Sequence, residues 1–280
     1  MGIFLNVSFT IIEFIGGWLT NSTAIMADAV HDLGDSLSIG SAWILNKLSA
    51  KNSNNEFTYG YRRLSLFGAL INGIVLVIGS IWVLFQSVPR LIDPVMPMTE
   101  GMLGLAVLGI CVNGYAAFKL SSGNSLNEKV LNWHLLEDVL GWVAVFVVAI
   151  VLMIVELPIL DPVLAICFTI FILFNVIRNL KDTLKIFFQA VPETEYIQKI
   201  RHDLNEINEI EEVHHEHCWS LDGEKNVYTA HVKLLSFIEF DVHKALKNKI
   251  SEQLEKYNLA CITIEFEYPG EECRDKNKIL

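Results

Sequence analysis

The sequence predicts an α-helical membrane protein with six transmembrane helices and a C-terminal α+β domain. The chain of 280 residues is 52% hydrophobic, with a mean hydropathy of +0.41, which is too apolar for an ordinary soluble domain of this length. Its charge is uneven, with a net −8 over residues 193–280 and −3 over residues 1–192. We therefore expect a transmembrane domain at 1–190, a water-soluble domain at 191–270 and a mobile tail at 271–280. This acidic balance predicts no nucleic-acid partner.

Six apolar segments have about the length that a bilayer requires. They are residues 1–20, 21–45, 64–88, 101–120, 127–155, and 163–177 or beyond. The fourth segment is rich in glycine and small residues, which allow close helix approach.

Orientation follows from the positions of lysine and arginine. The opposite side of the membrane carries only Arg90. The loops after the second, fourth and sixth segments carry Lys47, Lys51, Arg62, Arg63, Lys119, Lys129, Arg178, Lys181 and Lys185. We therefore expect both termini in the cytoplasm and the protein in the plasma (inner) membrane.

The second segment carries Asp28, His31, Asp32 and Asp35 within an otherwise apolar run. On a helix these four side chains fall within an arc of about 100°. His31 and Asp35 are one turn apart, so a ring nitrogen and a carboxylate oxygen can converge. Ionisable groups inside a membrane are costly, and their presence indicates a functional site.

The same His-x-x-x-Asp spacing recurs at His134 and Asp138 in the fifth segment. Two such pairs supply two nitrogens and two oxygens, a set that suits tetrahedral Zn²⁺. A proton relay, or buried polar pairs that hold helices together, would explain one such motif, but the duplication favours a metal site. Accessory positions beside it are Asp28, Asp32, Glu137 and Glu13, although Glu13 also fits simple packing against another helix.

The soluble segment predicts the order α-β-β-α-β. The expected helices cover 194–208 and 240–257, and the expected strands cover 213–221, 227–235 and 260–268. Asp222-Gly223 is a common turn between the first two strands. This order makes a small open sandwich with one layer of helices.

Histidines and a cysteine gather in the first expected strand, as the segment His-His-Glu-His-Cys at 214–218. They suggest a second metal site, as do His231 and His243. Histidines on a solvated strand face would be an equally ordinary explanation. On a regular strand His214 and His217 would face opposite ways and could not bind one ion. His231 and Glu267, on the two other strands, could join one of them.

The five cysteines include no Cys-x-x-Cys pair. This pattern favours reduced thiols over a disulfide framework.

Several motifs together resemble the cation diffusion facilitator family, in its zinc-type (cobalt–zinc–cadmium) branch. They are ADAVHDLGD, YGYRR, NWHLLED, DP before the sixth helix, AVPE at the junction, and HCWSLDG with AHV in the soluble segment. The resemblance covers nearly the whole chain. It implies a homodimeric divalent-metal/H⁺ antiporter in the lipid bilayer, paired through its membrane helices and a ferredoxin-like cytoplasmic domain.

The resemblance also implies roles for individual residues. His31, Asp35, His134 and Asp138 would bind the transported ion, which we expect to be Zn²⁺, with Cd²⁺ or Co²⁺ as further substrates. By the same resemblance, His214, His231 and Glu267 match positions that bind regulatory zinc in some members. Two features depart from the family pattern: the loop at 54–58 lacks a histidine, and residues 121–125 replace a histidine-rich loop.

Two other classes of membrane protein could also hold a metal at this depth. An intramembrane metalloprotease is disfavoured because His-Glu-x-x-His is absent, so we expect no enzyme. A membrane metal sensor that binds without moving the ion remains open. Within transport, Mn²⁺ or Fe²⁺ is the alternative, but two imidazoles favour zinc over manganese.

Overall fold

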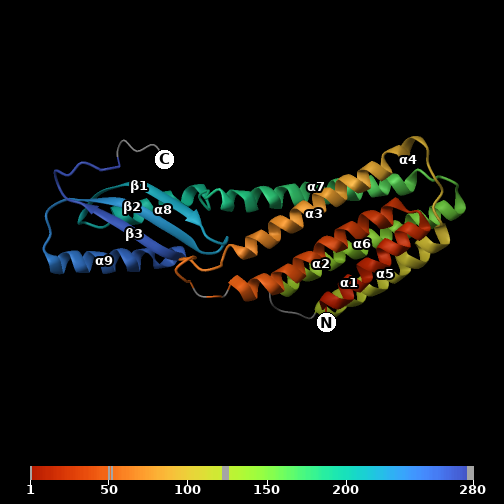
Figure 1. Ribbon diagram of the computed structural model, residues 1–280, viewed down its shortest axis with the longest axis horizontal. Helices are drawn as coiled ribbons and strands as arrows, with labels where there is room; N and C mark the ends of the chain where they lie inside the picture. Colours follow the sequence, from red (N-terminus) through yellow and green to blue (C-terminus); the bar gives the residue numbers. More distant parts are fainter. Residues whose placement is uncertain (1, 50, 52, 122–125, 276–280) are drawn as a thin grey trace. The chain divides into compact units, whose positions relative to one another are not determined.

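The computed structural model describes residues 2–49, 51, 53–121 and 126–275 (Figure 1). The chain divides into two compact units. The first comprises Met1–Ile44 and Gly68–Leu180, and the second comprises Leu45–Phe67 and Lys181–Leu280.

Helices occupy each of the apolar segments that the sequence predicts. They are α1 (Gly2–Thr20), α2 (Thr23–Ser49), α3 (Leu64–Ser87), the short α4 (Pro89–Ile92), α5 (Thr99–Leu120), α6 (Leu126–Ile154) and α7 (Leu160–Phe187). Among the described residues, α3, α5, α6 and α7 are long and apolar enough to cross a membrane. In α1 the apolar stretch, Phe4–Thr20, is shorter, and α2 contains the ionisable residues noted above.

The second unit contains a mixed sheet of three strands. Its elements are α8 (Thr194–Asn205), β1 (Ile210–Ser220), β2 (Asn226–Leu234), α9 (Phe240–Leu254), the 3₁₀ turn η1 (Glu255–Tyr257) and β3 (Leu259–Glu267). Strand β2 lies in the middle, antiparallel to β1 and parallel to β3. The element order is the one that the sequence predicts.

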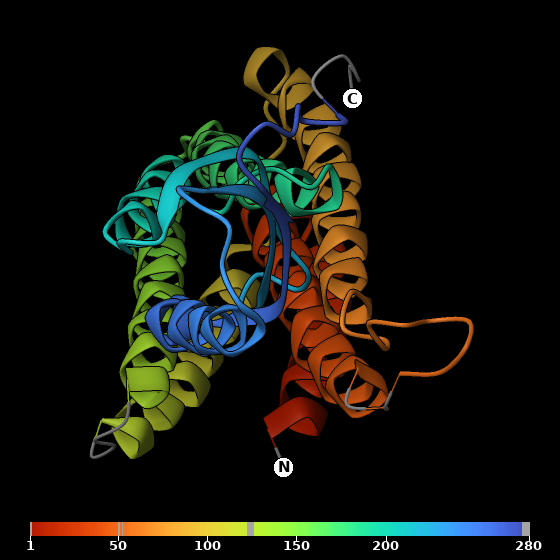
Figure 2. The same ribbon diagram turned by 90° about the vertical axis from the view of Figure 1, so that its left-hand side faces the viewer.

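Helices α8 and α9 pack on the same face of this sheet (Figure 2). Ile200 and Leu204 of α8 join Leu246 and Ile250 of α9 in a core with the inward residues of the strands. Side chains alternate between faces along a strand, so the face opposite the helices carries the polar positions. These are the positions of His214, His231, Glu265 and Glu267.

A β-bulge interrupts β1 between His214 and His217. His214 pairs with His231 while His217 pairs with Thr229, so three steps along β1 match two along β2. His215 has a φ of +48°, in the left-handed region. The extra residue reverses the alternation of side chains, and the expectation that His214 and His217 face opposite ways is therefore wrong.

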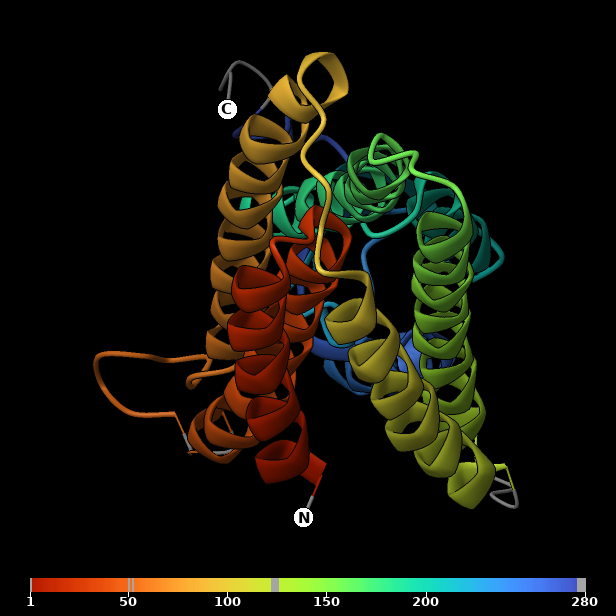
Figure 3. The same ribbon diagram turned by 90° about the vertical axis from the view of Figure 1, so that its right-hand side faces the viewer.

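The helices of the first unit approach closely at glycines. Helices α5 and α6 lie side by side (Figure 3), and a Cβ on Gly109 would lie 2.2 Å from the Trp142 ring. A Cβ on Gly34 of α2 would lie 2.5 Å from Leu76 Cδ2 of α3. Small residues thus set the spacing of these helices, as the glycine content of the fourth segment predicts.

Asp161, at the start of α7, holds the first turn of α2. Its carboxylate accepts hydrogen bonds from Ser22 Oγ (2.5 Å), Thr23 N (2.7 Å), Thr23 Oγ1 (2.8 Å) and Ala24 N (3.3 Å). The side chain of Asp161 is buried. It satisfies amide groups that a helix N-terminus leaves free, and so fixes the end of the helix that carries His31 and Asp35.

Candidate metal centres

Two helices of the first unit bring four candidate ligands together. His31 Nε2 of α2 lies 3.7 Å from Asp35 Oδ2 and 3.6 Å from Asp138 Oδ1. His134 Nε2 of α6 lies 2.8 Å from Asp35 Oδ2 and 4.0 Å from Asp138 Oδ2. One ligand atom from each residue lies within 4.8 Å of all the others. We call these four residues the helix cluster.

The helix cluster results directly from the two His-x-x-x-Asp motifs. Within each motif the one-turn spacing places both side chains on one helix face, and the two faces meet. A cavity of about 540 Å³ opens beside them. The Asp138 side chain is 9% exposed, and the other three are 25–33% exposed, so the site is shielded yet reachable.

The accessory acids lie in the same region. Asp28 and Glu137 line the cavity. Asp32 and Glu13 are buried. Glu13 is close enough to Asp28 and Asp32 to interact with both electrostatically. The part that these acids play stays a prediction.

Polar groups from two other helices also line this cavity. They are Asn72 of α3 and Asn175 and Asn179 of α7. Asn72 is a strongly polar residue in an apolar segment, a signal that could have placed it here. Asn175 lies inside the sixth apolar segment and carried the same signal, whereas Asn179 follows that segment and gave none.

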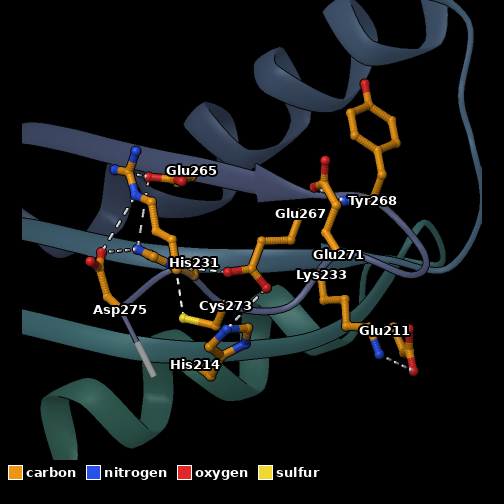
Figure 4. Close-up of polar contacts among 11 residues, drawn as sticks. Glu211, His214, His231, Lys233, Glu265, Glu267, Tyr268, Glu271, Cys273 and Asp275 are labelled. Carbon is orange, nitrogen blue, oxygen red and sulfur yellow. Dashed lines mark hydrogen bonds and ion pairs between the residues drawn. The ribbon is translucent and has the colours of Figure 1, made fainter. Parts of the chain in front are cut away.

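A second group forms on the sheet of the second unit (Figure 4). Glu267 lies between two imidazoles, with Oε1 2.8 Å from His231 Nδ1 and Oε2 3.1 Å from His214 Nε2. Cys273 Sγ lies 3.4 Å from His231 Nδ1. One ligand atom from each of these four residues lies within 4.8 Å of all the others. We call them the sheet cluster.

The other ring nitrogen of His231 faces a different set of groups. His231 Nε2 lies 3.6 Å from Asp275 Oδ2 and 3.9 Å from Glu265 Oε2. The rings of His215 and His231 are 4.9 Å apart. His215, His231 and Asp275 could also hold an ion, and they line a cavity of about 380 Å³ that His217 also borders.

The charge of Glu267 is stabilised by its neighbours. Burial raises the pKa of this carboxyl, but the hydrogen bond with His231 and the charge of His214 outweigh it, so the pKa is lowered. A carboxylate that stays ionised is ready to bind a cation.

Two other residues that the sequence suggested lie elsewhere. Burial raises the pKa of the Cys218 thiol to about 11, and Cys218 belongs to the hydrophobic core. His243 packs against the ring of Phe266 at 4.8 Å. Neither belongs to a group of candidate ligands among the described residues.

Cys273 and Asp275 were missed by sequence reasoning because residues 271–280 were expected to form a mobile tail. A thiol and three acids in the short run Glu271-Glu-Cys273-Arg-Asp275, just beyond the last strand, were the available signal.

The two clusters differ in the donor atoms that they offer. The helix cluster offers two nitrogens and two oxygens, and the sheet cluster offers two nitrogens, one oxygen and one sulfur. Both sets contain two imidazoles and match the ligands that Zn²⁺ takes in tetrahedral sites. Each carries two groups that are anionic when deprotonated, enough to neutralise a divalent ion.

Comparison with known proteins agrees with this chemistry. The cation efflux transmembrane domain family matches residues 1–188. The chain is 30% identical to the cadmium, cobalt and zinc/H(+)-K(+) antiporter of Bacillus subtilis (strain 168), over 92% of this chain and 85% of the relative. It is 31% identical to the zinc transporter ZitB of Yersinia pseudotuberculosis, over 93% and 84%. It is 28% identical to the metal cation efflux system protein CzcD of Cupriavidus metallidurans, over 94% and 84%. The chain belongs to the cation efflux family, a family of membrane transporters and not of enzymes.

Proposed function

We propose that this protein is a divalent metal cation efflux transporter that exchanges Zn²⁺ for H⁺ and binds the metal at the helix cluster. The observation that carries the proposal is the convergence of His31, Asp35, His134 and Asp138, with ligand atoms within 4.8 Å of one another. The named activities of the relatives, which include zinc transport and antiport of cadmium, cobalt and zinc, support Cd²⁺ and Co²⁺ as further substrates.

The proposed architecture has six membrane crossings, formed by α1, α2, α3, α5, α6 and α7. The distribution of lysine and arginine supports cytoplasmic termini. We place the protein in the plasma (inner) membrane. We assign residues 1–190 to the transmembrane domain, 191–270 to a ferredoxin-like cytoplasmic domain and 271–280 to a tail. The protein would act as a homodimer, paired through the cytoplasmic domain and the membrane helices.

Exchange follows from the chemistry of imidazole. Zinc binds only the neutral ring, and free histidine titrates near pH ~6.5. Facing a near-neutral cytoplasm, His31 and His134 would bind zinc. Facing a more acidic exterior, they would take up protons and release it. A protonated ring then balances the charge of Asp35 or Asp138, so the empty site returns without two bare carboxylates, which a membrane disfavours.

The site must face each side of the membrane in turn, which helices achieve by rocking against one another. Glu13, Asp28, Asp32 and Glu137 would help ions enter or support the ligands from outside.

A regulatory role is proposed for the soluble domain. Zinc bound at His214, His231 and Glu267 would signal a high cytoplasmic metal concentration by changing the separation of the two protomers. The ionised state of Glu267 and the short distances to both imidazoles support binding there.

The decisive experiment measures zinc flux in liposomes that contain the purified protein, with and without a pH gradient, at a fixed zinc gradient. We expect an acidic compartment opposite the cytoplasmic face to accelerate flux toward it. Flux that ignores the pH gradient would identify a passive facilitator. Zinc binding without any flux would identify a membrane metal sensor, and flux of Mn²⁺ or Fe²⁺ in preference to zinc would change the substrate.

A further inference from the structure

Two residues of the sheet cluster are buried although the cluster lies on the face of the sheet opposite α8 and α9. His231 is 7% exposed and Glu267 is 5% exposed. Polar residues on that face of a small domain would ordinarily be solvated. Two residues after β3 cover them instead. Cys273 contacts both His231 and Glu267, and Asp275 contacts His231 (Figure 4).

Specific contacts hold this segment in place. Gly270 has a φ of +91°, which glycine adopts without strain and which reverses the chain after β3. Glu271 Oε2 accepts a hydrogen bond from the Tyr268 amide at 2.7 Å. Arg274 forms ion pairs with Glu265 and with Asp275. The turn therefore delivers Cys273 to His231 by defined interactions.

The two nitrogens of His231 have different surroundings, and this difference selects a role for each. Without a metal ion, Nδ1–H donates a hydrogen bond to Glu267 Oε1 at 2.8 Å. A metal ion bound at Nδ1 would replace that proton, and the neutral ring would then carry its proton on Nε2, on the side of Asp275 and Glu265. Carboxylates commonly orient metal-binding histidines in this way.

His214 can also bind a metal ion through a ring nitrogen. Its ring nitrogens are buried and make no well-formed hydrogen bond among the described residues, although Nε2 is at ion-pair distance, 3.1 Å, from Glu267 Oε2. A buried imidazole without a hydrogen bond is unfavourable. A metal ion bound between His214, His231 and Glu267 would satisfy it.

We propose that Cys273 is the fourth ligand of this site, as a thiolate, and that Asp275 and Glu265 position His231. The inference deepens the proposed function, since it rests on the assignment of His214, His231 and Glu267 as metal ligands. The complete set is two nitrogens, one oxygen and one sulfur, suited to a thiophilic divalent cation such as Zn²⁺, Cd²⁺ or Co²⁺. Glu267 and the thiolate together neutralise the ion.

The sulfur ligand changes what the site responds to. Mn²⁺ and Mg²⁺ prefer oxygen ligands and gain little from a thiolate. The site would therefore report thiophilic cations and ignore these two. It would also tie the chain beyond β3 to the sheet when metal is bound.

Cobalt absorption on the purified full-length protein tests the proposal. Co²⁺ bound to a thiolate gives a strong near-ultraviolet charge-transfer band, and the helix cluster, which contains no sulfur, cannot give one. In the unaltered protein we expect a band intensity that corresponds to about one bound Co²⁺ ion per chain. Cys273→Ser should lose the band and bind cobalt at the sheet cluster at least ~10-fold more weakly, since even outer contacts of a metal site cost 10–100-fold.

The matched control is Cys261→Ser. Cys261 is a half-buried cysteine on β3, outside the candidate ligand groups of the described residues, and its replacement should leave the band intact. His214→Ala should remove the band although all five cysteines remain.

A band that persists in Cys273→Ser, or that is absent from the unaltered protein, would overturn the proposal. So would unchanged cobalt affinity in Cys273→Ser. The band is independent of transport, so a failed liposome flux assay and a failed absorption assay are separate results.

Discussion

The helix cluster and the sheet cluster both hold two imidazoles, yet they are built on different supports. The helix cluster joins α2 and α6, so its geometry depends on how two helices pack. The sheet cluster takes three of its residues from adjacent strands, whose backbones are fixed to one another by hydrogen bonds. Its imidazole at His231 is also flanked by Asp275 and Glu265.

This difference teaches what each site can do. A transport site has to release its ion, so ligands on separate helices that can move apart are an advantage. A sensing site has to keep its geometry and change only its occupancy. The sheet, the carboxylates around His231 and the added thiol suit retention, while the nitrogen–oxygen set of the helix cluster suits exchange.

The largest expected effect concerns the helix cluster, the proposed transport site. Asp138→Ala removes one of two carboxylates and leaves three ligands with unmatched charge. We expect zinc flux to fall by at least ~100-fold, because even outer contacts of a metal site cost 10–100-fold. Liposome flux measures the loss. Glu156→Ala, which removes an exposed carboxylate outside the cavity, is the matched control and should keep the flux. Normal flux in Asp138→Ala would remove the residue from the site.

The second prediction changes the donor type of the helix cluster. His31→Asp replaces a nitrogen by an oxygen, and oxygen-rich sites favour harder ions such as Mn²⁺. We expect the ratio of manganese flux to zinc flux to rise by about 10-fold, of the order of one ligand's contribution. The dependence of flux on the pH gradient should change with it, since one titrating imidazole is gone. An unchanged ratio would mean that His31 does not contact the ion.

The third prediction concerns retention at the sheet cluster. Segment 191–280 has a hydrophobic core of its own, and zinc bound only by the folded form should stabilise it. At a free zinc concentration 100 times Kd the gain is about 2.7 kcal/mol, seen as a higher Tm. The same segment with His214→Ala should show little of this gain. A Tm unaffected by saturating zinc would leave these histidines without a metal-binding role.

The smallest expected effect tests the framework that supports the sheet cluster. Asp203 of α8 accepts hydrogen bonds from Tyr257 Oη at 2.5 Å and from Lys256 Nζ at 2.7 Å. Burial raises the pKa of Asp203, but these two groups outweigh it, so the pKa lies below its usual value. The stabilisation is therefore present above the unfolded-state pKa and is lost as pH falls through the lower, folded-state pKa.

Asp203→Asn should accordingly cost about 1 kcal/mol in the free energy of unfolding at neutral pH, the typical worth of such a hydrogen bond. The difference from the unaltered segment should shrink in acid, below about pH 4. Urea unfolding of segment 191–280 at several pH values measures it. A cost that is constant with pH would show that the carboxylate charge contributes nothing.

The local parts of both clusters could be predicted from the sequence, and the distant parts could not. A one-turn spacing brings His31 to Asp35 on any helix, so the two motifs were readable. Their meeting depends on how α2 packs against α6, which the sequence does not fix. The pairing of His214 with His231 required the strand register.

The remaining differences arise from single backbone features. The left-handed conformation of His215 creates the bulge, and no residue type in His-His-Glu-His-Cys demands it. The positive φ of Gly270 turns the chain back toward the sheet, so that Cys273 reaches His231 on β2. Sequence patterns describe periodicity, and these two residues change the direction of the chain without leaving a periodic signal.

The hydrogen bonds from the first turn of α2 to Asp161 have a mechanical consequence. A helix held at one end tilts about that end, and His31 lies eight residues beyond Thr23, about 12 Å along the axis. A tilt of about 1° would displace His31 by about 0.2 Å, the tolerance of a metal–ligand distance. A tilt of about 10° would displace it by about 2 Å, the length of a whole zinc–nitrogen bond. With Asp161 as the pivot, α2 is a lever long enough for a small angle to open the coordination shell.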